Sequence, residues 1–415
     1  MSAAVRSGAD TADRADETGA IVHETFGQAL RRLRGQLSLR DLARLAACGK
    51  SYIGDLEHGR RQPTSAMAAA LDDALDAGGE LCLLAASPPG ASLSAQAAAL
   101  QAGIADALAA GPMTDASLDE WAYTVARHGR ATRHRPEQLH LPELLADFAD
   151  LQRIVAHRHP PAIRKQLVIA VAKMAGLMAL TLLKLGDPAA RDWWRTGRAA
   201  AAAAEDRATL SWIYAQESYQ HYYGGDMHGA VELAVRSQHL AGGLPCVGPA
   251  LSAPLEARAH AALRSPDEAA SALCRGEEAL HRLDAVDCVA SAFGYSESQF
   301  RFHAGNTWTH LHESGRAWDE QQQALQLYPA TDYTDRTLVQ LDRAACLIHD
   351  GDPAAAASLA VQAVTALPED HRSPLIIFRA RELIDTVPER QELPEVRVLR
   401  EVLALPPGER ILTTW

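Results

Sequence analysis

The sequence predicts an all-α protein with a small N-terminal helical bundle and a C-terminal α-solenoid of helical hairpins. Three observations support this prediction: aromatic residues make up only 5% of the 415 residues, alanine is frequent, and no stretch alternates in the manner of a strand. Short amphipathic helices can be drawn near the N-terminus, and tight turns recur beyond residue 161. The length leaves room for two or three domains.

Changes in composition along the chain predict five segments. Residues at the N-terminus are polar and acidic, whereas Ser87-Pro-Pro-Gly90 has the composition of a linker and is a possible pivot. We expect a disordered N-terminus at 1–22, the N-terminal bundle at 23–86, a linker with an Ala-rich helical stretch at 87–112, connecting helices at 113–160 and the repeat domain at 161–415.

Two helices are expected between residues 25 and 46. Thr25 is a plausible N-cap of the first, which has an apolar stripe at Phe26, Leu30 and Leu33. Ser38 caps the second, and Asp41 three residues later completes a pattern similar to a capping box. The buried face of this second helix is expected to consist of Leu39, Leu42, Ala43, Leu45 and Ala46.

A third helix is expected from Lys50 to Glu57. Gly49 makes the turn before it, and Gly59 ends it in the position where helices commonly have a glycine. Pro63 blocks any continuation. The three helices have the spacing of a helix-turn-helix, which places a short helix in the major groove of DNA.

The charge distribution agrees with DNA binding by this segment. The whole chain carries a net charge of −12, which argues against nonspecific binding to nucleic acid. From Phe26 to Pro63, however, eight basic residues stand against three acidic ones, a local balance of +5. Such a small basic island suits a sequence-specific reader of modest affinity, and modest affinity implies a dimer that binds two half-sites.

The runs Ser38-Leu-Arg-Asp-Leu-Ala43 and Lys50-Ser-Tyr-Ile-Gly-Asp-Leu-Glu-His-Gly-Arg-Arg-Gln-Pro63 resemble the Cro/repressor-type (XRE) helix-turn-helix family. The resemblance extends from Thr25 to roughly Leu84. It implies contacts to base edges from Lys50, Ser51 and Asp55, and contacts to the DNA backbone from Ser38, Tyr52, His58, Arg60 and Arg61.

Two positions depart from this family's pattern. Leu39 lies where many relatives have a polar residue such as glutamine, so one usual contact is missing. Asp55 can accept a hydrogen bond from a cytosine amine, but its charge repels phosphate. A three-helix bundle with no role in DNA binding is the alternative interpretation of the segment.

Beyond residue 161 the tight turns recur at intervals of 39, 40, 49 and 37 residues. This pattern resembles tetratricopeptide-type helical hairpins with extended connections. Stacked hairpins form a superhelix with a concave face that binds extended peptides or partner helices. The turns are expected at Gly186-Asp187, Gly225-Asp226, Ser265-Pro266, Ser314-Gly315 and Gly351-Asp352.

The first helix of each hairpin should line the concave face, and residues 212–223 and 296–310 are rich in groups that could hold a ligand. An asparagine can pair with a peptide backbone through its donor and its acceptor, and an arginine can bind a carboxylate with two hydrogen bonds. Packing between repeats is the alternative role of these side chains. The candidate effector-binding residues are Tyr214, Arg258, Gln299, Arg301, Asn306, Arg343 and Arg379.

The sequence contains no motif that indicates catalysis. It lacks a phosphate-binding glycine loop, an H-E-x-x-H motif and a nucleophile elbow, so we expect neither an enzyme nor a cofactor. The pairs His157–His159 and His310–His312 are spaced i, i+2, which places the two rings on different sides of a helix, and no metal site is expected.

Targeting signals are also absent from the sequence. No run of 18 apolar residues and no signal peptide is recognised, so we expect no contact with a membrane. The six scattered cysteines lack a C-x-x-C pair and suit a reduced, cytoplasmic protein. The basic run at 127–135 suggests either contact with DNA or an acidic partner, or a solvated helix end.

The order of the two regions resembles that of XRE–tetratricopeptide regulators of high-GC actinobacteria. The resemblance implies a homodimeric, sequence-specific DNA-binding regulator of transcription, whose repeat domain dimerises and senses an effector; a peptide is the expected effector. The alternative is a DNA-tethered scaffold whose repeats recruit a protein partner without sensing a ligand. A regulator with no ligand, controlled only by its abundance, is a third possibility.

Overall fold

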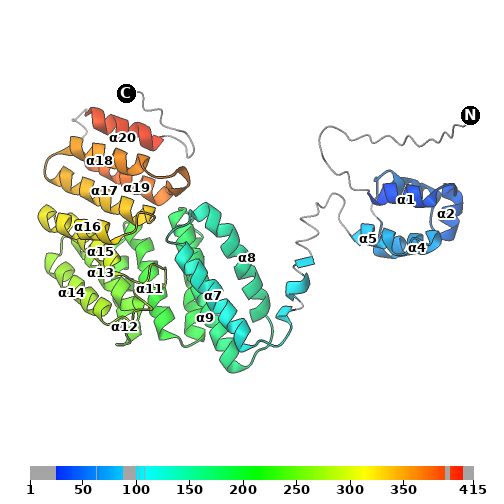
Figure 1. The fold of residues 1–415 in the computed structure, drawn as a ribbon, viewed down its shortest axis with the longest axis horizontal. Helices are drawn as coiled ribbons and strands as arrows, with labels where there is room; N and C mark the ends of the chain where they lie inside the picture. Colours follow the sequence, from blue (N-terminus) through cyan, green and yellow to red (C-terminus); the bar gives the residue numbers. More distant parts are fainter. Residues whose placement is uncertain are drawn as a thin grey trace, which may run out of the picture. The chain divides into compact units, whose positions relative to one another are not determined.

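The computed structural model describes residues 25–61, 63–86, 100–101, 103–106, 108–387 and 393–404. Every regular element in these ranges is a helix, which confirms the all-α prediction (Figure 1). The chain divides into two compact units, residues 1–107 and 108–415. The expectations for residues 1–22 and for a pivot at Ser87–Gly90 fall outside the described residues.

The first unit is a bundle of short helices around one small core. Leu30, Leu42, Ile53, Leu56 and Leu71 are all almost completely buried in it. The helices are α1 (Phe26–Arg34), α2 (Leu39–Leu45), α3 (Lys50–Glu57), α4 (Ser65–Leu75) and α5 (Glu80–Ala86).

The predicted N-caps of the first two helices are confirmed. Thr25 accepts a hydrogen bond from the Gln28 amide and forms a capping box with its side chain. Ser38 accepts from the Asp41 amide, but the Asp41 carboxylate binds the Ser38 hydroxyl at 2.6 Å, so the backbone half of the capping box does not form. Both helix starts are therefore fixed by local side chains.

One expected core residue of this bundle lies on the surface. Leu45 is 61% exposed, so its prediction as part of the buried face of α2 is wrong. The residues that α2 and its C-cap bury are Leu42, Ala43 and Ala46, and this spacing turns Leu45 away from the core. The bundle also depends on a close approach between α1 and α3, because a Cβ at Gly27 would lie 2.6 Å from the Leu56 carbonyl oxygen.

The second unit is an array of helical hairpins (Figure 1). Consecutive helices pack as pairs, and the first helices of the pairs α9, α11, α13, α15, α17 and α19 also pack on one another in that order. The helices are α7 (Asp115–Ala131), α8 (Glu137–Val155), α9 (Pro161–Lys184), α10 (Ala190–Ala203), α11 (Arg207–Tyr223), α12 (Met227–Ala241), α13 (Val247–Ala262), α14 (Pro266–His281), α15 (Glu297–His310), α16 (Ser314–Leu327), α17 (Tyr333–His349), α18 (Pro353–Thr365), α19 (Pro374–Thr386) and α20 (Pro394–Ala404), with a short 3-10 helix at Glu369–His371.

Three of the five expected turns fall wholly between helices. Gly186, Gly225 and Gly351 have φ angles of 74°, 80° and 89°, a left-handed conformation that favours glycine. The other two overlap the helix that follows. Pro266 is the first residue of α14, and α16 already begins at Ser314, where the turn is made by His312, whose φ is 61°. The turn chemistry thus marks the hairpins reliably, to within a few residues.

The longest interval, 49 residues, has a structural cause. The connection between α14 and α15 leaves the hairpin and folds against other helices of the unit. Its Ala292 amide donates to the Gly129 carbonyl at 2.8 Å, and its Ala292 carbonyl accepts from the Trp212 indole at 2.7 Å. This segment, residues 282–296, therefore joins the end of α7 to α11.

Helix α9 has the length and composition of a membrane-spanning helix, although charged residues interrupt it and no run of 18 apolar residues is present. Its 24 residues, Pro161–Lys184, include a window of mean hydropathy 1.9, and among the described residues it is the one helix long and apolar enough. Within the array 61% of that window is buried. The helix packs against α7, α8, α10 and α11, so its apolar composition is that of a core helix of the array.

Candidate DNA-reading surface and effector cavity

The first turn of α3 presents polar side chains to solvent. Lys50 and Ser51 are exposed, while Ile53 and Leu56 on the opposite side of the helix are buried in the bundle. Gly49 caps the helix without a side chain, so no capping group covers its first amides. A lysine can donate to guanine and a serine can pair with several bases, which makes this turn suitable for reading base edges.

Asp55 lies against the two arginines that follow α3. Its carboxylate oxygens are 3.9 Å from Arg60 Nη1 and from Arg61 Nε, and its backbone carbonyl accepts hydrogen bonds from both backbone amides. The exposed ion pairs contribute little to stability. Their geometry favours a role for Asp55 in positioning the two arginines, beside the predicted role in contacting a base.

The other residues predicted to contact the DNA backbone lie on the surface with partners of their own. The Ser38 hydroxyl binds Asp41, and the Tyr52 ring is 5.7 Å from the Arg61 guanidinium carbon. His58 Nδ1 is 2.6 Å from the Gly54 carbonyl oxygen and its Nε2 is 3.4 Å from Arg31 Nη2. The contact with the Gly54 carbonyl of α3 thus fixes the orientation of the His58 ring.

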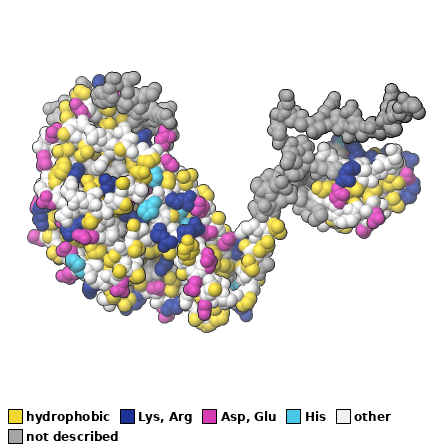
Figure 2. Space-filling view, viewed as in Figure 1, with side chains coloured by type: hydrophobic (Ala, Val, Ile, Leu, Met, Phe, Trp, Pro, Cys, Tyr) yellow, Lys and Arg dark blue, Asp and Glu magenta, His cyan; other side chains and the backbone are white. Residues whose placement is uncertain are grey.

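Part of the basic island is paired with a buried acid of the bundle. The Glu57 carboxylate is 3% exposed and binds Arg34 at 2.5 Å and Arg31 at 3.5 Å. Sequence reasoning counted these arginines as a basic surface, because it could not place Glu57 in the core. The net charge available to DNA is therefore carried more by Lys50 and the residues after α3 than by α1. Figure 2 shows charged side chains of both signs on the visible faces of both units.

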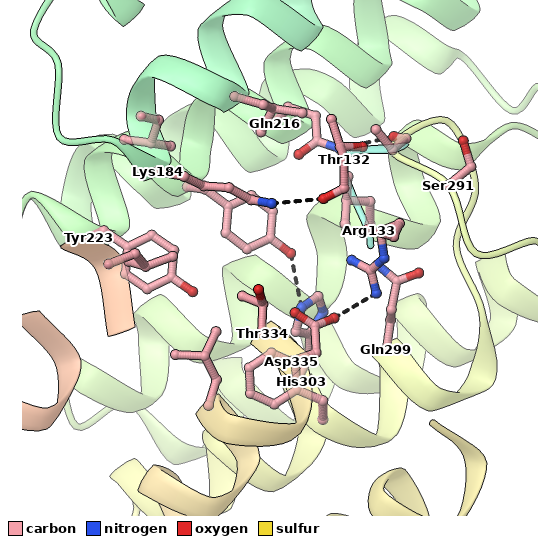
Figure 3. Close-up of a pocket in the computed structure, with 18 of the residues that line it drawn as sticks. Thr132, Arg133, Lys184, Gln216, Tyr223, Ser291, Gln299, His303, Thr334 and Asp335 are labelled. Atoms are coloured by element: carbon pink, nitrogen blue, oxygen red, sulfur yellow. Dashed lines mark hydrogen bonds and ion pairs between the residues drawn. The ribbon is translucent and has the colours of Figure 1, made fainter. Parts of the chain in front are cut away.

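The second unit contains a partly enclosed cavity of about 120 Å³ (Figure 3). It is bounded by the C-terminal end of α7, by the connection at residues 291–294 and by successive first helices of the hairpins. Its lining residues are Thr132, Arg133, Leu180, Leu183, Lys184, Gln216, Tyr219, Tyr223, Leu251, Ser291, Ala292, Gly294, Gln299, Phe302, His303, Thr334, Asp335, Leu338 and Leu375.

An ion pair joins two edges of this cavity. Arg133 Nη2 at the end of α7 lies 2.6 Å from Asp335 and 3.2 Å from Asp332. Burial raises the pKa of Asp332 to about 6, with the neighbouring Asp335 adding to the effect. Burial also opposes ionisation of Asp335, but the Arg133 guanidinium and the Tyr328 hydroxyl keep its pKa below the ordinary value.

Several residues of the basic run at 127–135 have acidic partners within the array. Arg127 binds Asp147 at 2.6 Å, Arg135 binds Glu143 at 2.5 Å, and Arg133, which binds Asp335, is only 15% exposed. Arg130 of the same run is exposed. The basic charge of the run is therefore partly neutralised, and the alternatives for its role stay predictions.

Two tyrosines hold a buried histidine at the floor of the cavity. The His303 ring lies 3.0 Å from the Tyr219 hydroxyl at Nε2 and 2.8 Å from the Tyr295 hydroxyl at Nδ1. Burial, aided by the charges of Arg258 and Arg133, lowers the pKa of His303 well below its ordinary value. The imidazole is therefore neutral, with one donor and one acceptor nitrogen.

Three of the predicted effector residues form a buried polar network behind the cavity. Arg258 Nε donates to Asn306 Oδ1 at 2.7 Å, and Asn306 Nδ2 donates to Asp342 at 2.8 Å. Asp342 in turn binds Arg379 at 3.3 Å, and Tyr222 donates to Asn306 Oδ1 at 3.0 Å. These contacts link α11, α13, α15, α17 and α19, as expected for packing between repeats, although Arg258 Nη1 is buried without a hydrogen-bond partner among the described residues.

The remaining effector candidates do not come together. Gln299 lines the cavity, but Tyr214 lies beneath the guanidinium groups of Arg198 and Arg236. Arg301 bridges Glu297 and Glu320, at another place on α15. Arg343 stacks on Trp318, 4.6 Å from the ring centre, and binds Gln322.

Sequence reasoning missed most of the cavity. Arg133 and Asp335 are about two hundred residues apart, and nothing in their local patterns links them. Lys184 and Tyr219 belong to different hairpins, and only the stacking of α9 on α11 brings them to one space. The unusually long interval before α15 is the one signal that could have pointed to the connecting segment over the cavity.

Comparison with known proteins agrees with the geometry of the first unit. Its fold and exposed α3 define a helix-turn-helix domain, and residues 25–83 match a family described as a helix-turn-helix domain. No curated protein matches the chain significantly. A crystal structure of BtubC (BKLC) from P. vanneervenii aligns with 18% identity and a TM-score of 0.39, over 55% of this chain and 89% of that chain. This similarity is too low to support an inference about function.

Proposed function

We propose that the chain is a sequence-specific DNA-binding regulator of transcription rather than an enzyme, and that it acts in the cytoplasm. The observation that carries the proposal is the exposed first turn of α3 on a bundle that matches the helix-turn-helix domain. In this proposal Lys50 and Ser51 contact base edges, Asp55 does so or positions its neighbours, and Ser38, Tyr52, His58, Arg60 and Arg61 contact the DNA backbone.

The proposal includes a homodimer. The basic island is small, and Glu57 neutralises part of the charge of Arg31 and Arg34, so a single reader should bind with modest affinity and little specificity. Two readers on one duplex would supply both affinity and half-site spacing. We assign dimerisation to the hairpin array, which we infer to be tetratricopeptide-like.

The array is proposed to sense an effector. Support comes from a cavity lined by the first helices of several hairpins and by the end of α7. Along the chain, α7 is the first long helix of the array after the reader. A ligand that binds one arrangement of these helices better than another shifts the population between them. A peptide is the effector that the resemblance implies, and the small cavity would accept one of its side chains or its terminus.

Selection from a random double-stranded DNA library tests the DNA-binding role. The full-length protein should enrich one motif, and the variant Lys50→Ala with Ser51→Ala should lose that selectivity while keeping its helical circular dichroism. Gly315→Ala is a control outside the reader, because Gly315 lies in α16 and a Cβ there meets nothing within 4 Å. If no motif is enriched, the protein is not a sequence-specific regulator.

A DNA-tethered scaffold is the competing function, favoured if the array binds a protein without changing DNA affinity. The two functions differ in one measurement. Operator affinity is measured with and without cell extract or peptides encoded by neighbouring genes. A sensor should change its affinity at least severalfold, whereas unchanged affinity together with capture of a protein by the array supports the scaffold.

A further inference from the structure

The cavity of the array has an apolar body and a polar floor. Its volume of about 120 Å³ is roughly ten times the ~10–15 Å³ that one buried water needs. Much of its wall is aliphatic or aromatic, so binding here would remove the apolar part of an occupant from water, which is favourable. The apolar lining residues are Leu180, Leu183, Leu251, Phe302, Leu338 and Leu375.

The charged groups around the cavity are already ion-paired with one another. Arg133 binds Asp335, and Lys184 Nζ donates to the Thr132 carbonyl at 2.9 Å (Figure 3). Arg133 also binds Asp332, and Lys184 Nζ lies 3.1 Å from Glu137. An anionic ligand would meet Asp335 as well as the cations, and a cationic ligand would meet Arg133 and Lys184. The cavity therefore favours an uncharged occupant.

The hydrogen bonds of His303 fix the direction of one donor. Tyr295 is completely buried, and its hydroxyl has no partner other than His303 Nδ1 among the described residues. A buried hydroxyl proton left without an acceptor is costly, so Tyr295 donates to Nδ1. Nε2 then carries the ring proton and donates to the Tyr219 oxygen, which leaves the Tyr219 proton free to point into the cavity.

The orientation of Gln299 fixes a second donor. Its Oε1 accepts from the Ser296 amide at 3.3 Å in the capping box of α15. Because a backbone N–H must face an acceptor, the amide cannot be flipped, and Nε2 faces away from the cap. Within the described residues this NH2 group has no hydrogen-bond partner, and Gln299 lines the cavity.

The cavity thus holds two donors that the protein itself does not satisfy, the Tyr219 hydroxyl and the Gln299 NH2 group. The Asp335 oxygen that faces Arg133, in contrast, already accepts from that residue and from Tyr328. An occupant that supplies acceptors would complete this arrangement.

We propose that this cavity is the effector site and that its ligand is a small, uncharged, mostly apolar molecule carrying carbonyl-type oxygens. Tyr219 and Gln299 donate hydrogen bonds to those oxygens, and the leucines and Phe302 surround the apolar part. This inference rests on the proposed sensing role of the array, and it replaces the peptide suggested by the resemblance with a small molecule as the occupant of this cavity.

Three probes of similar length and different charge test the proposal. Ethyl hexanoate is uncharged, its isomer octanoic acid is anionic at neutral pH, and octylamine is cationic. Binding to the full-length protein is measured by saturation-transfer NMR and by titration, with dissociation constants in the millimolar range expected for ligands of this size. The ester should bind at one saturable site, at least fivefold more tightly than either charged probe.

Two variants assign the donors and one controls for general effects. Tyr219→Phe removes one donor, and Gln299→Glu keeps the capping acceptor while replacing the free NH2 by an oxygen. Each should weaken ester binding about five- to tenfold, the loss expected for one hydrogen bond. Tyr123→Phe, at a 58% exposed position on α7, should leave binding unchanged.

Tighter binding of octanoate or octylamine than of the ester would overturn the proposal, as would saturable binding by none of the three probes. Equal ester binding by Tyr219→Phe, Gln299→Glu and the wild type would also overturn it. These outcomes are independent of DNA binding. Failure of the ligand chemistry therefore leaves the selected DNA motif intact, whereas failure of the regulator proposal appears as the absence of a motif.

Discussion

The substitution Asn306→Asp exchanges an amide for a carboxylate at the centre of the buried polar network of the array. Asn306 is the only asparagine in the chain, and it is 1% exposed. In Asn306→Asp the acceptor toward Arg258 and Tyr222 remains, but the donor toward Asp342, at 2.8 Å, becomes a second carboxylate oxygen. Two carboxylates at this distance cannot both stay ionised without a large cost.

The cost is limited by protonation of one of the two carboxyl groups. Starting from an unfolded pKa of about 3.9, holding one proton at pH 7 costs at most about 4 kcal/mol of unfolding free energy, and at pH 5 about 1.5 kcal/mol. A folded pKa raised above the unfolded value makes the variant recover stability, relative to the wild type, as the pH falls. A merely steric defect would not depend on pH in this way.

A second substitution should restore the pattern of donors and charges. In Asn306→Asp with Asp342→Asn, the new amide at 342 can donate to the new carboxylate at 306, and the number of charges is that of the wild type. We expect the double variant to recover more than half of the lost stability. Gln322→Glu, at the exposed partner of Arg343, is the matched control and should change stability by less than about 0.5 kcal/mol.

Urea unfolding followed by tryptophan fluorescence measures these effects in the full-length protein. All seven tryptophans follow residue 120, so the signal reports on the second unit and not on the reader. The reasoning is refuted if Asn306→Asp costs less than about 1 kcal/mol at pH 7, or if the double variant is as unstable as the single one.

Three further variants test other contacts. Gly27→Ala should destabilise the reader by about 1–3 kcal/mol because its Cβ would meet the α3 backbone; amide hydrogen exchange in the reader measures this, and an effect no larger than that of Gly54→Ala would contradict it. Arg34→Met leaves the Glu57 carboxylate without its 2.5 Å partner and should cost about 2–4 kcal/mol by the same measurement; retained protection would exclude a structural role for the pair. Burial lowers the pKa of His310 to about 3, whereas the ring binds a proton near pH 6.5 once the protein is unfolded. The wild type should therefore lose about 2 kcal/mol of unfolding free energy between pH 7 and pH 5 because of His310. By urea unfolding, His310→Gln should lose less stability over that interval. Identical losses would disprove this assignment.

The local structure could be predicted from sequence wherever short-range chemistry decides it. The caps at Thr25 and Ser38 follow from side chains that bind amides three residues away. The bounds of α3 follow instead from the glycines at 49 and 59 that precede and follow it. The hairpin turns at Gly186 and Gly351 follow from a backbone conformation that glycine adopts readily. Leu45 was misplaced because a short helix has few turns from which to fix its buried face.

The candidate sites divide in the same way. The surface of α3 could be predicted because consecutive residues of one helix build it. The cavity could not be predicted, because its ion pair joins Arg133 to Asp335, which are far apart in the sequence. The direction in which the Tyr219 hydroxyl donates also depends on which tyrosine pairs with each nitrogen of His303. Asn306 and Arg258 were recognised as unusual, but sequence alone could not separate binding a ligand from binding each other.

A hydroxyl-radical footprint of the full-length protein on its selected DNA tests the central claim most directly. The account predicts two protected half-sites whose centres are one helical turn apart, about 10–10.5 base pairs, or a multiple of it. The variant Lys50→Ala with Ser51→Ala should lose this protection. Uniform protection without half-sites, or protection that survives this variant, would contradict the proposal that paired helix-turn-helix readers recognise a specific operator.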